Sequence, residues 1–105
     1  MRNRFLSTLL NCAEQDERIF LISIDLGYSV LEPFFERFPK RYLNVGVQEQ
    51  NAVSVAAGLA KTGRIVYVYS IVPFATMRCY EQIRIDCAYY DVPVRLVGVG
   101  AGYAY

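Results

Sequence analysis

Glu49 is the side chain whose setting in this sequence most suggests chemistry. It carries the only charge between Arg41 and Lys61, and an apolar run of mostly small residues from Ala52 to Ala60 follows it closely. A helix that is apolar nearly all round is usually buried on most sides. Glu49 would then lie at the mouth of a buried helix, where a carboxylate needs a partner or a proton.

A second set of polar residues follows a predicted strand. Asp25 and Ser29 belong to the loop after the apolar run from Ile19 to Ile24. Polar side chains in such a loop can act on a ligand, but they can equally stabilise the loop through Asx-type hydrogen bonds. Both interpretations apply to Asp25 and Ser29.

The elements that position these residues follow from the apolar pattern. Short continuous apolar runs predict strands buried in a parallel sheet at 19–24, 64–69 and 94–99, with a brief strand at 41–44. Helical spacing predicts helices at 4–14 and 30–38. The helix that follows Glu49 and contains the run from Ala52 to Ala60 is the central helix, and Thr62-Gly63 ends it. Because strands and helices alternate, the predicted fold class is α/β, a three-layer parallel sheet with helices on both faces.

A last helix is predicted from about Ala75 to Tyr90. One of its faces groups four side chains, Met77, Tyr80, Ile83 and Cys87. Charged residues three apart can pair across a turn of it, namely Arg78, Glu81 and Arg84.

Three loops are expected at the ligand-binding edge, because ligands of open parallel sheets bind outside the carboxyl ends of the strands. These loops are 25–29, 70–74 and 98–105. The chain stops inside the third loop, so we expect the natural domain to be truncated here and to continue beyond Tyr105.

Composition limits the remaining classes of function. A length of 105 residues supports one domain, which we assign to residues 1–105. The net charge of +1 offers no field for nucleic acid, and no apolar run reaches the roughly 18 residues of a membrane span. Three scattered cysteines and no histidine predict no metal site and a reducing, cytoplasmic compartment.

Four stretches, in order and at the right spacing, resemble one known family. Asn-Val-Gly-Val-Gln-Glu-Gln-Asn-Ala-Val at 44–53, with Ala-Ala-Gly-Leu-Ala at 56–60, is similar to the central motif of the pyrimidine-binding domain of transketolase-type thiamine diphosphate enzymes. The other matching stretches are Ile-Asp-Leu-Gly-Tyr-Ser at 24–29, the loop and helix at 73–84, and Val-Gly-Val-Gly-Ala-Gly at 97–102. The resemblance covers nearly the whole chain and implies the thiamine diphosphate-binding fold of that domain.

The resemblance also implies roles for individual residues. Glu49 matches the catalytic carboxyl group that hydrogen-bonds the far ring nitrogen of the aminopyrimidine and so promotes loss of the C2 proton of the cofactor. Burial favours the neutral form that this role needs. Phe74 matches the aromatic side chain that packs on the pyrimidine ring. Asp25 and Met77 match positions near the cofactor, whereas Ser29 and Arg4 (or Arg2) match positions that bind the sugar phosphate.

The chain departs from the family pattern at the ring pocket and at the sugar site. Met77 stands where some members have a ring-contacting Tyr, and Ile71 and Val72 occupy the place of a second Phe in a loop that is one residue shorter. The chain has no His, whereas transketolases use several on sugar hydroxyls. One of those would follow Tyr105.

The implied function is transfer of a two-carbon ketol unit between sugar phosphates in carbohydrate metabolism. The diphosphate-binding Gly-Asp-Gly…Asn motif is absent from this sequence. A partner subunit or domain would therefore hold the diphosphate and its magnesium, and this chain would be inactive without it. Because the cofactor lies between protomers in the family, a dimer or larger homo- or hetero-oligomer is implied.

Two other functions stay open. Deoxyxylulose-phosphate synthase belongs to the same superfamily, but its motif usually reads Ala-Glu-Gln-His, where this chain has Gln48-Glu49-Gln50-Asn51. The second is a non-catalytic module that only dimerises with, or regulates, a full-length relative.

Overall fold

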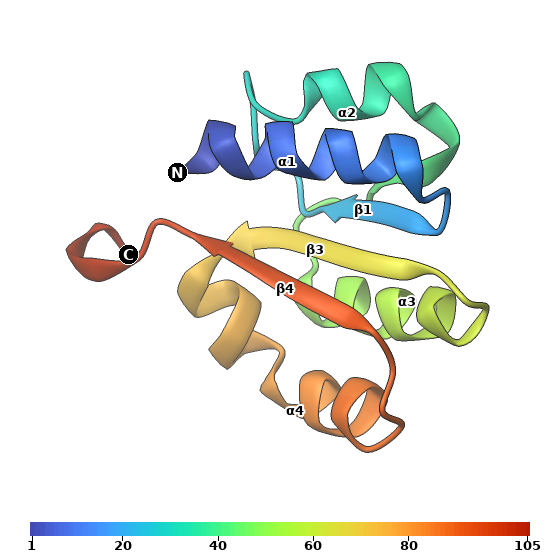
Figure 1. Ribbon diagram of the computed structural model, residues 1–105. Helices are drawn as coiled ribbons and strands as arrows, with labels where there is room; N and C mark the ends of the chain where they lie inside the picture. Colours follow the sequence, from blue (N-terminus) through green and yellow to red (C-terminus); the bar gives the residue numbers. More distant parts are fainter.

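A parallel four-stranded sheet forms the middle layer of the computed structural model, which describes residues 1–105 (Figure 1). The spatial order of the strands is β2-β1-β3-β4, and all three neighbouring pairs are parallel. Their bounds are β1 Ile19–Ser23, β2 Tyr42–Asn44, β3 Ile65–Ile71 and β4 Val94–Val99. The predicted α/β sheet and its four strands are confirmed.

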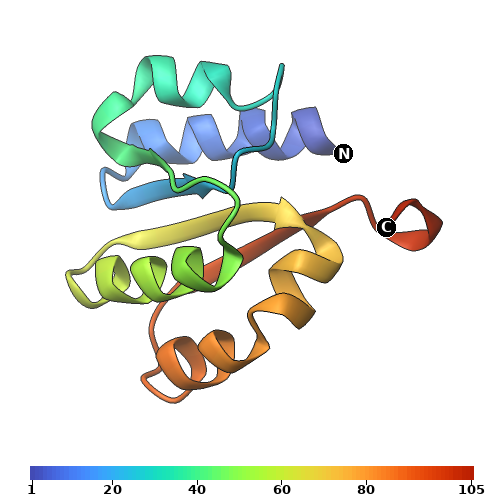
Figure 2. The same cartoon turned by 180° about the vertical axis from the view of Figure 1, so that it is seen from behind.

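Helices cover both faces of the sheet, also as predicted (Figures 1 and 2). Helices α1 (Arg2–Gln15) and α2 (Glu32–Arg37) lie on one face. The other face carries α3 (Glu49–Lys61) and a helical segment that follows β3. Short 3-10 turns lie at η1 (Pro39–Arg41) and η4 (Gly102–Ala104).

The two faces are packed with side chains of different size. Large buried residues of α1, α2 and the strands fill the first face, among them Leu6, Leu9, Leu21, Phe34 and Tyr69. On the second face α3 places small residues, Ala52, Ala56 and Ala60, against Ile22, Val66 and Val68. Small side chains let a helix approach a sheet closely. This close packing of α3 keeps its first residue, Glu49, buried.

The predicted last helix is not continuous. The segment divides into a π-helical turn η2 (Phe74–Arg78), a short α4 (Tyr80–Gln82) and a second π-helical turn η3 (Ile83–Ala88). The expected common face does not form, because Met77 and Tyr80 are exposed while Ile83 and Cys87 are half-buried. A π turn holds more residues than an α turn, so spacing of three and four no longer keeps side chains on one side.

One further expectation about burial is wrong, and another is confirmed. The strand β4 is an edge strand whose Arg95 and Gly98 are exposed, so it is not buried on both faces. The helix α3 is buried on most sides, as expected, since Val53 and Ala57 are buried together with its sheet-facing alanines. It exposes a stripe of Asn51, Ser54, Gly58 and Lys61. Its apolar composition reflects packing against both the sheet and the helical segment after β3.

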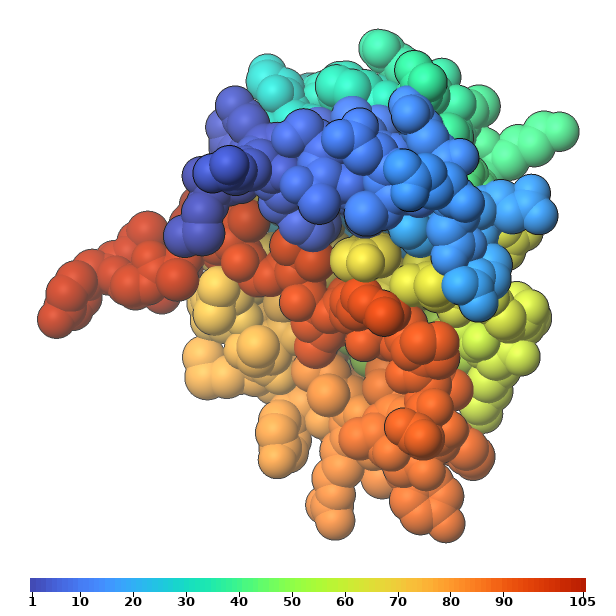
Figure 3. Space-filling view, in the orientation of Figure 1, coloured from blue at the N-terminus to red at the C-terminus, as the bar shows by residue number.

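Both ends of the chain lie on the side where the strands end. The first residues of α1 lie beside the loop after β4, and the last residues project from the body of the molecule (Figure 3). None of the helices is both long enough and apolar enough to cross a membrane.

Candidate active site

Asn44, the last residue of β2, joins two loops at the carboxyl edge of the sheet. Its Oδ1 accepts hydrogen bonds from the backbone N–H of Asp25 at 2.9 Å and of Gly46 at 3.0 Å. Its Nδ2 donates to Asp25 Oδ1 at 3.2 Å. Asp25 has a φ of +53°, a left-handed conformation that Asp tolerates better than most residues. Hydrogen bonds within the chain therefore hold Asp25 in place without a ligand.

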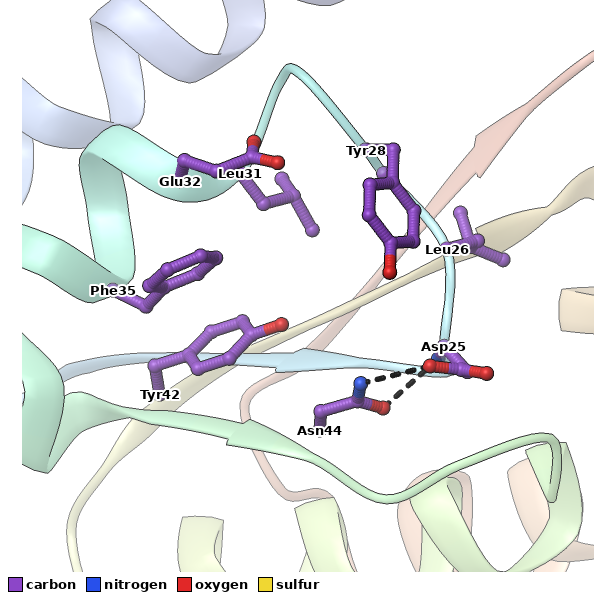
Figure 4. Close-up of a pocket in the computed structure, with 9 residues that line it drawn as sticks. Asp25, Leu26, Tyr28, Leu31, Glu32, Phe35, Tyr42 and Asn44 are labelled. Carbon is purple, nitrogen blue, oxygen red and sulfur yellow. Dashed lines mark hydrogen bonds between the residues drawn. The ribbon is translucent and has the colours of Figure 1, made fainter.

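Hollows line the carboxyl ends of the strands, where the topology predicts ligand binding. One of about 270 Å³ lies beside Asp25 and is walled by the rings of Tyr28, Phe35 and Tyr42 (Figure 4). Tyr42 is fixed by a 2.6 Å hydrogen bond between its hydroxyl and that of Ser23. A second hollow, of about 650 Å³, lies among the loops after β1 and β4, the end of β3 and the start of α1.

Glu49 begins α3 and is only 2% exposed, as its sequence setting predicts. Its Oε2 accepts a hydrogen bond from Nη1 of Arg78 at 2.9 Å, which makes an ion pair. Its Oε1 makes no hydrogen bond in the protein. A buried carboxyl group with one free oxygen can still bind a donor or acceptor from outside the chain.

Arg78 is the site residue that the sequence analysis did not identify. Sequence spacing predicts that it pairs with Glu81 along its own helix, but its partner is Glu49, 29 residues earlier. Its guanidinium carbon lies 4.1 Å from the centre of the Phe74 ring, a stacked cation–π contact. The only sequence signal for Arg78 is its place in the family-like stretch at 73–84. Residue spacing within one helix cannot reveal a contact between separate elements.

The π-helical turn η2 brings Phe74 and Arg78 to Glu49. Such turns are frequent at functional sites, and this one is anchored by the buried Cys79, whose Sγ donates to the Ala75 carbonyl at 3.1 Å. Burial raises the pKa of the Cys79 thiol, and the charge of Glu49 raises it further. Cys79 is therefore a neutral packing residue beside the ion pair.

Of the other three predicted residues, only Met77 belongs to an element of the Glu49 and Phe74 cluster. Ser29 has a φ of +59°, and its backbone N–H donates to Glu32 Oε1 at 2.8 Å. Arg4 lines a groove of about 450 Å³ between α1 and β4. Met77 belongs to η2 and is 74% exposed. Their predicted roles stay predictions.

Taken together, the fold and the site define a class of α/β domain. A buried carboxyl group with a free oxygen stands beside a half-buried aromatic ring, at the edge of the sheet where ligands bind. That pair suits a flat heterocycle with a ring nitrogen, since the ring can stack on Phe74 while Glu49 hydrogen-bonds its edge.

Comparison with known proteins agrees with this class. The family model described as the transketolase pyrimidine-binding domain matches residues 1–105. The chain belongs to this family, whose enzymes use thiamine diphosphate. The predicted family and the fold it implies are thus confirmed.

The relatives include subunits of split transketolases. A subunit of the apulose-4-phosphate transketolase of Phocaeicola vulgatus is 38% identical over 105 residues, which cover 99% of this chain and 34% of that protein. A split-gene transketolase solved as an inactive beta4 tetramer superposes with a TM-score of 0.84 and 31% identity, covering 92% of this chain and 32% of that one. The chain thus spans about a third of the length of these relatives.

The alternative enzyme of the same superfamily is also related. The 1-deoxy-D-xylulose-5-phosphate synthase of Gloeobacter violaceus is 41% identical over 93 residues, which cover 86% of this chain and 14% of that protein. Sequence identity by itself therefore does not separate the two reactions.

Proposed function

We propose that this chain is the pyrimidine-binding part of a split, thiamine diphosphate-dependent transketolase. The enzyme would transfer a two-carbon ketol unit between sugar phosphates in the cytoplasm. The observation that carries the proposal is Glu49, which is 2% exposed at the start of α3 and keeps Oε1 free. The full-length match to a transketolase domain family supports it.

Glu49 and Phe74 would hold the aminopyrimidine ring. Glu49 Oε1 would hydrogen-bond the ring nitrogen, and its position in a nearly dry setting would strengthen that bond. The face of Phe74 would support the ring by stacking. The bound cofactor supplies the electron sink, while these residues orient it and help move its C2 proton.

Four further residues are proposed at the rim of the site. Asp25 is held rigidly by Asn44 beside the hollow of about 270 Å³, and this suits a contact to the cofactor at a subunit interface. Met77 is exposed on the same π-helical turn as Phe74, where it would contact the ring. Ser29 and Arg4 would bind the phosphate of the sugar.

A partner would complete the active site. We propose that residues 1–105 act as one pyrimidine-binding domain, and that a separate diphosphate-binding subunit or domain holds the diphosphate and magnesium. Relatives named as individual subunits of a transketolase support this arrangement. The working enzyme would then be a hetero-oligomer with more than one copy of each part.

Reconstitution tests this function. The full-length protein is mixed with its diphosphate-binding subunit, thiamine diphosphate and magnesium, and then with a ketose phosphate donor and an aldose phosphate acceptor. We expect ketol transfer that neither subunit supports alone. Assembly of the two subunits without turnover on any donor would instead identify a non-catalytic dimerisation or regulatory module.

A deoxyxylulose-phosphate synthase activity is the second candidate, because one synthase of this type is 43% identical to the chain over 94 residues. The same reconstituted enzyme is supplied with pyruvate and glyceraldehyde 3-phosphate. Release of carbon dioxide with no transfer from ketose phosphates would favour the synthase over the transketolase.

A further inference from the structure

The guanidinium of Arg78 lies between the two residues proposed to hold the pyrimidine ring. It donates from Nη1 to Glu49 Oε2 at 2.9 Å, and its central carbon stands 4.1 Å from the centre of the Phe74 ring. One flat group therefore contacts the same two residues as the ring would: it bonds Oε2 of Glu49, beside the Oε1 assigned to the ring nitrogen, and it lies over the face of Phe74.

The hollows of the protein agree with this arrangement. Five hollows are present, and neither Glu49, Phe74 nor Arg78 lines any of them. The face of Phe74 that Arg78 lies over is thus covered by the guanidinium, and another flat ring could stack there only if Arg78 moved.

We propose that Arg78 is an internal occupant of the pyrimidine site, and that the aminopyrimidine of the cofactor must displace it in order to bind. The inference rests on the proposed function of Glu49 and Phe74. A guanidinium can stand in for an aminopyrimidine because both are planar, carry N–H donors at the edge and stack on aromatic rings.

The same contact gives Arg78 a protective role before the cofactor binds. Glu49 is buried, and a buried carboxylate without a partner is costly. The Arg78 side chain itself is 41% exposed, so it can swing out into water without crossing the core. The pair stabilises the cofactor-free protein. The apparent affinity for the cofactor is then reduced in proportion to the fraction of molecules in which Arg78 has swung away from Glu49.

Titration calorimetry of thiamine diphosphate binding tests the proposal on the full-length protein assembled with its diphosphate-binding subunit and magnesium. We expect Arg78→Ala to tighten binding about fivefold or more, because the competing ion pair and stack are lost. Arg84→Ala is the matched control, since Arg84 is exposed on the same segment and takes part in no ion pair. Its dissociation constant should equal that of the wild type.

A double-mutant cycle assigns the effect to Glu49. Glu49→Gln removes the ion pair but leaves the Arg78 side chain over Phe74, so the tightening caused by adding Arg78→Ala should be smaller than in the wild-type background. An undiminished effect of Arg78→Ala in the Glu49→Gln background would show that Arg78 does not act through the pair and would overturn the proposal. Unchanged or weaker binding by Arg78→Ala alone would overturn it as well.

A second variant and a second readout test the proposal even if Arg78→Ala does not fold. Arg78→Lys keeps the charge but loses the planar stack on Phe74, so its binding should lie between wild type and Arg78→Ala. In side-chain NMR spectra of the wild type, the Arg78 Nε–H resonance should carry a ring-current shift from Phe74 and lose it when the cofactor is added. A shift that persists in the bound enzyme would overturn displacement.

The outcomes separate this inference from the function on which it rests. If the assembled wild type does not bind thiamine diphosphate at all, the proposed function fails and displacement fails with it. If the wild type binds and Arg78→Ala binds no more tightly, the function stands and the inference about Arg78 alone is overturned.

Discussion

Asp25 and Glu49 are two carboxylates at the same edge of the sheet, and the chain holds them in opposite ways. Asp25 is exposed, and the side chain of Asn44 fixes it by accepting from its backbone N–H and donating to its Oδ1. Glu49 is 2% exposed and is held by one side chain, Arg78, that can leave. The first arrangement shapes a loop, whereas the second keeps a buried acid ready to exchange partners.

This difference shows how a fold separates structural from reactive acids. A carboxylate whose loop is fixed by hydrogen bonds within the chain keeps its place whether or not a ligand binds. A buried carboxylate with a free oxygen and a mobile partner can gain a great deal, since burial strengthens each hydrogen bond that it makes. The following changes test whether the two acids differ as described.

The largest effect on stability is expected at the Glu49 pair, and it should be asymmetric. In the cofactor-free full-length protein, Arg78→Ala should lower the free energy of unfolding by about 2 kcal/mol, because a buried carboxylate loses its partner. Glu49→Gln should cost less than about 1 kcal/mol, because the 41% exposed Arg78 regains water. Urea unfolding measures both losses. Equal losses would contradict the conclusion that Glu49 is buried and depends on Arg78 as its partner.

Asn44→Ala should have the next largest effect. It removes the acceptor of two backbone N–H groups and one donor to Asp25. The expected loss is about 1.5 kcal/mol of unfolding free energy, since these bonds lie at a partly wet edge. Asn44→Asp keeps the acceptor oxygens and should recover about half of that loss. If Asn44→Ala were neutral in urea unfolding, the loops would not depend on this residue.

Asp25→Asn should change stability by no more than about 0.5 kcal/mol. Asn tolerates the left-handed φ of +53° and keeps an oxygen for the Asn44 amide. A loss above about 1 kcal/mol would mean that the charge of Asp25, and not only its shape, stabilises the loop. In the assembled enzyme the same variant tests the proposed contact to the cofactor. Weaker cofactor binding with unchanged stability would show that the charge of Asp25 contributes to binding.

The smallest effect is expected at Asp16, a partly exposed acid that serves as the reference for Asp25 and Glu49. Hydrogen bonds from the side chain and backbone of Arg18 lower the pKa of Asp16 to about 2. Because the pKa in the folded protein is below that in the unfolded chain, the stabilisation is present above about pH 4 and is lost as the pH falls toward 2. NMR titration of the carboxyl carbon gives the midpoint, and a normal midpoint near 4 would contradict the pair.

Much of the fold could be predicted from the sequence because its strands are short continuous apolar runs and its turns carry Gly or Pro. Ile19–Ser23 and Ile65–Ile71 fall within two residues of the predicted strands. The segment after β3 was mispredicted, since periodicity assumes α-helical turns and this segment contains π-helical ones. The exposure of β4 depends on its place at the edge of the sheet, which strand patterns do not encode.

The site was only half predictable for a similar reason. Glu49 stands out because it is a single charge before a small-residue helix, and that local pattern fixes its burial. Arg78 does not stand out, because its partner is 29 residues away and the pair forms only when η2 folds over the start of α3. Contacts between elements decide which of several arginines becomes the partner.

Exchange of the C2 proton of thiamine diphosphate for deuterium tests the central claim about Glu49 most directly. The assembled wild-type enzyme, Glu49→Gln and the exposed control Glu17→Gln are loaded with cofactor in deuterated water, and the exchange rate is followed by NMR. We predict that Glu49→Gln slows exchange by about 10²- to 10⁴-fold, whereas Glu17→Gln exchanges like the wild type. An unchanged rate in Glu49→Gln would contradict the role of Glu49 as the acid of this site.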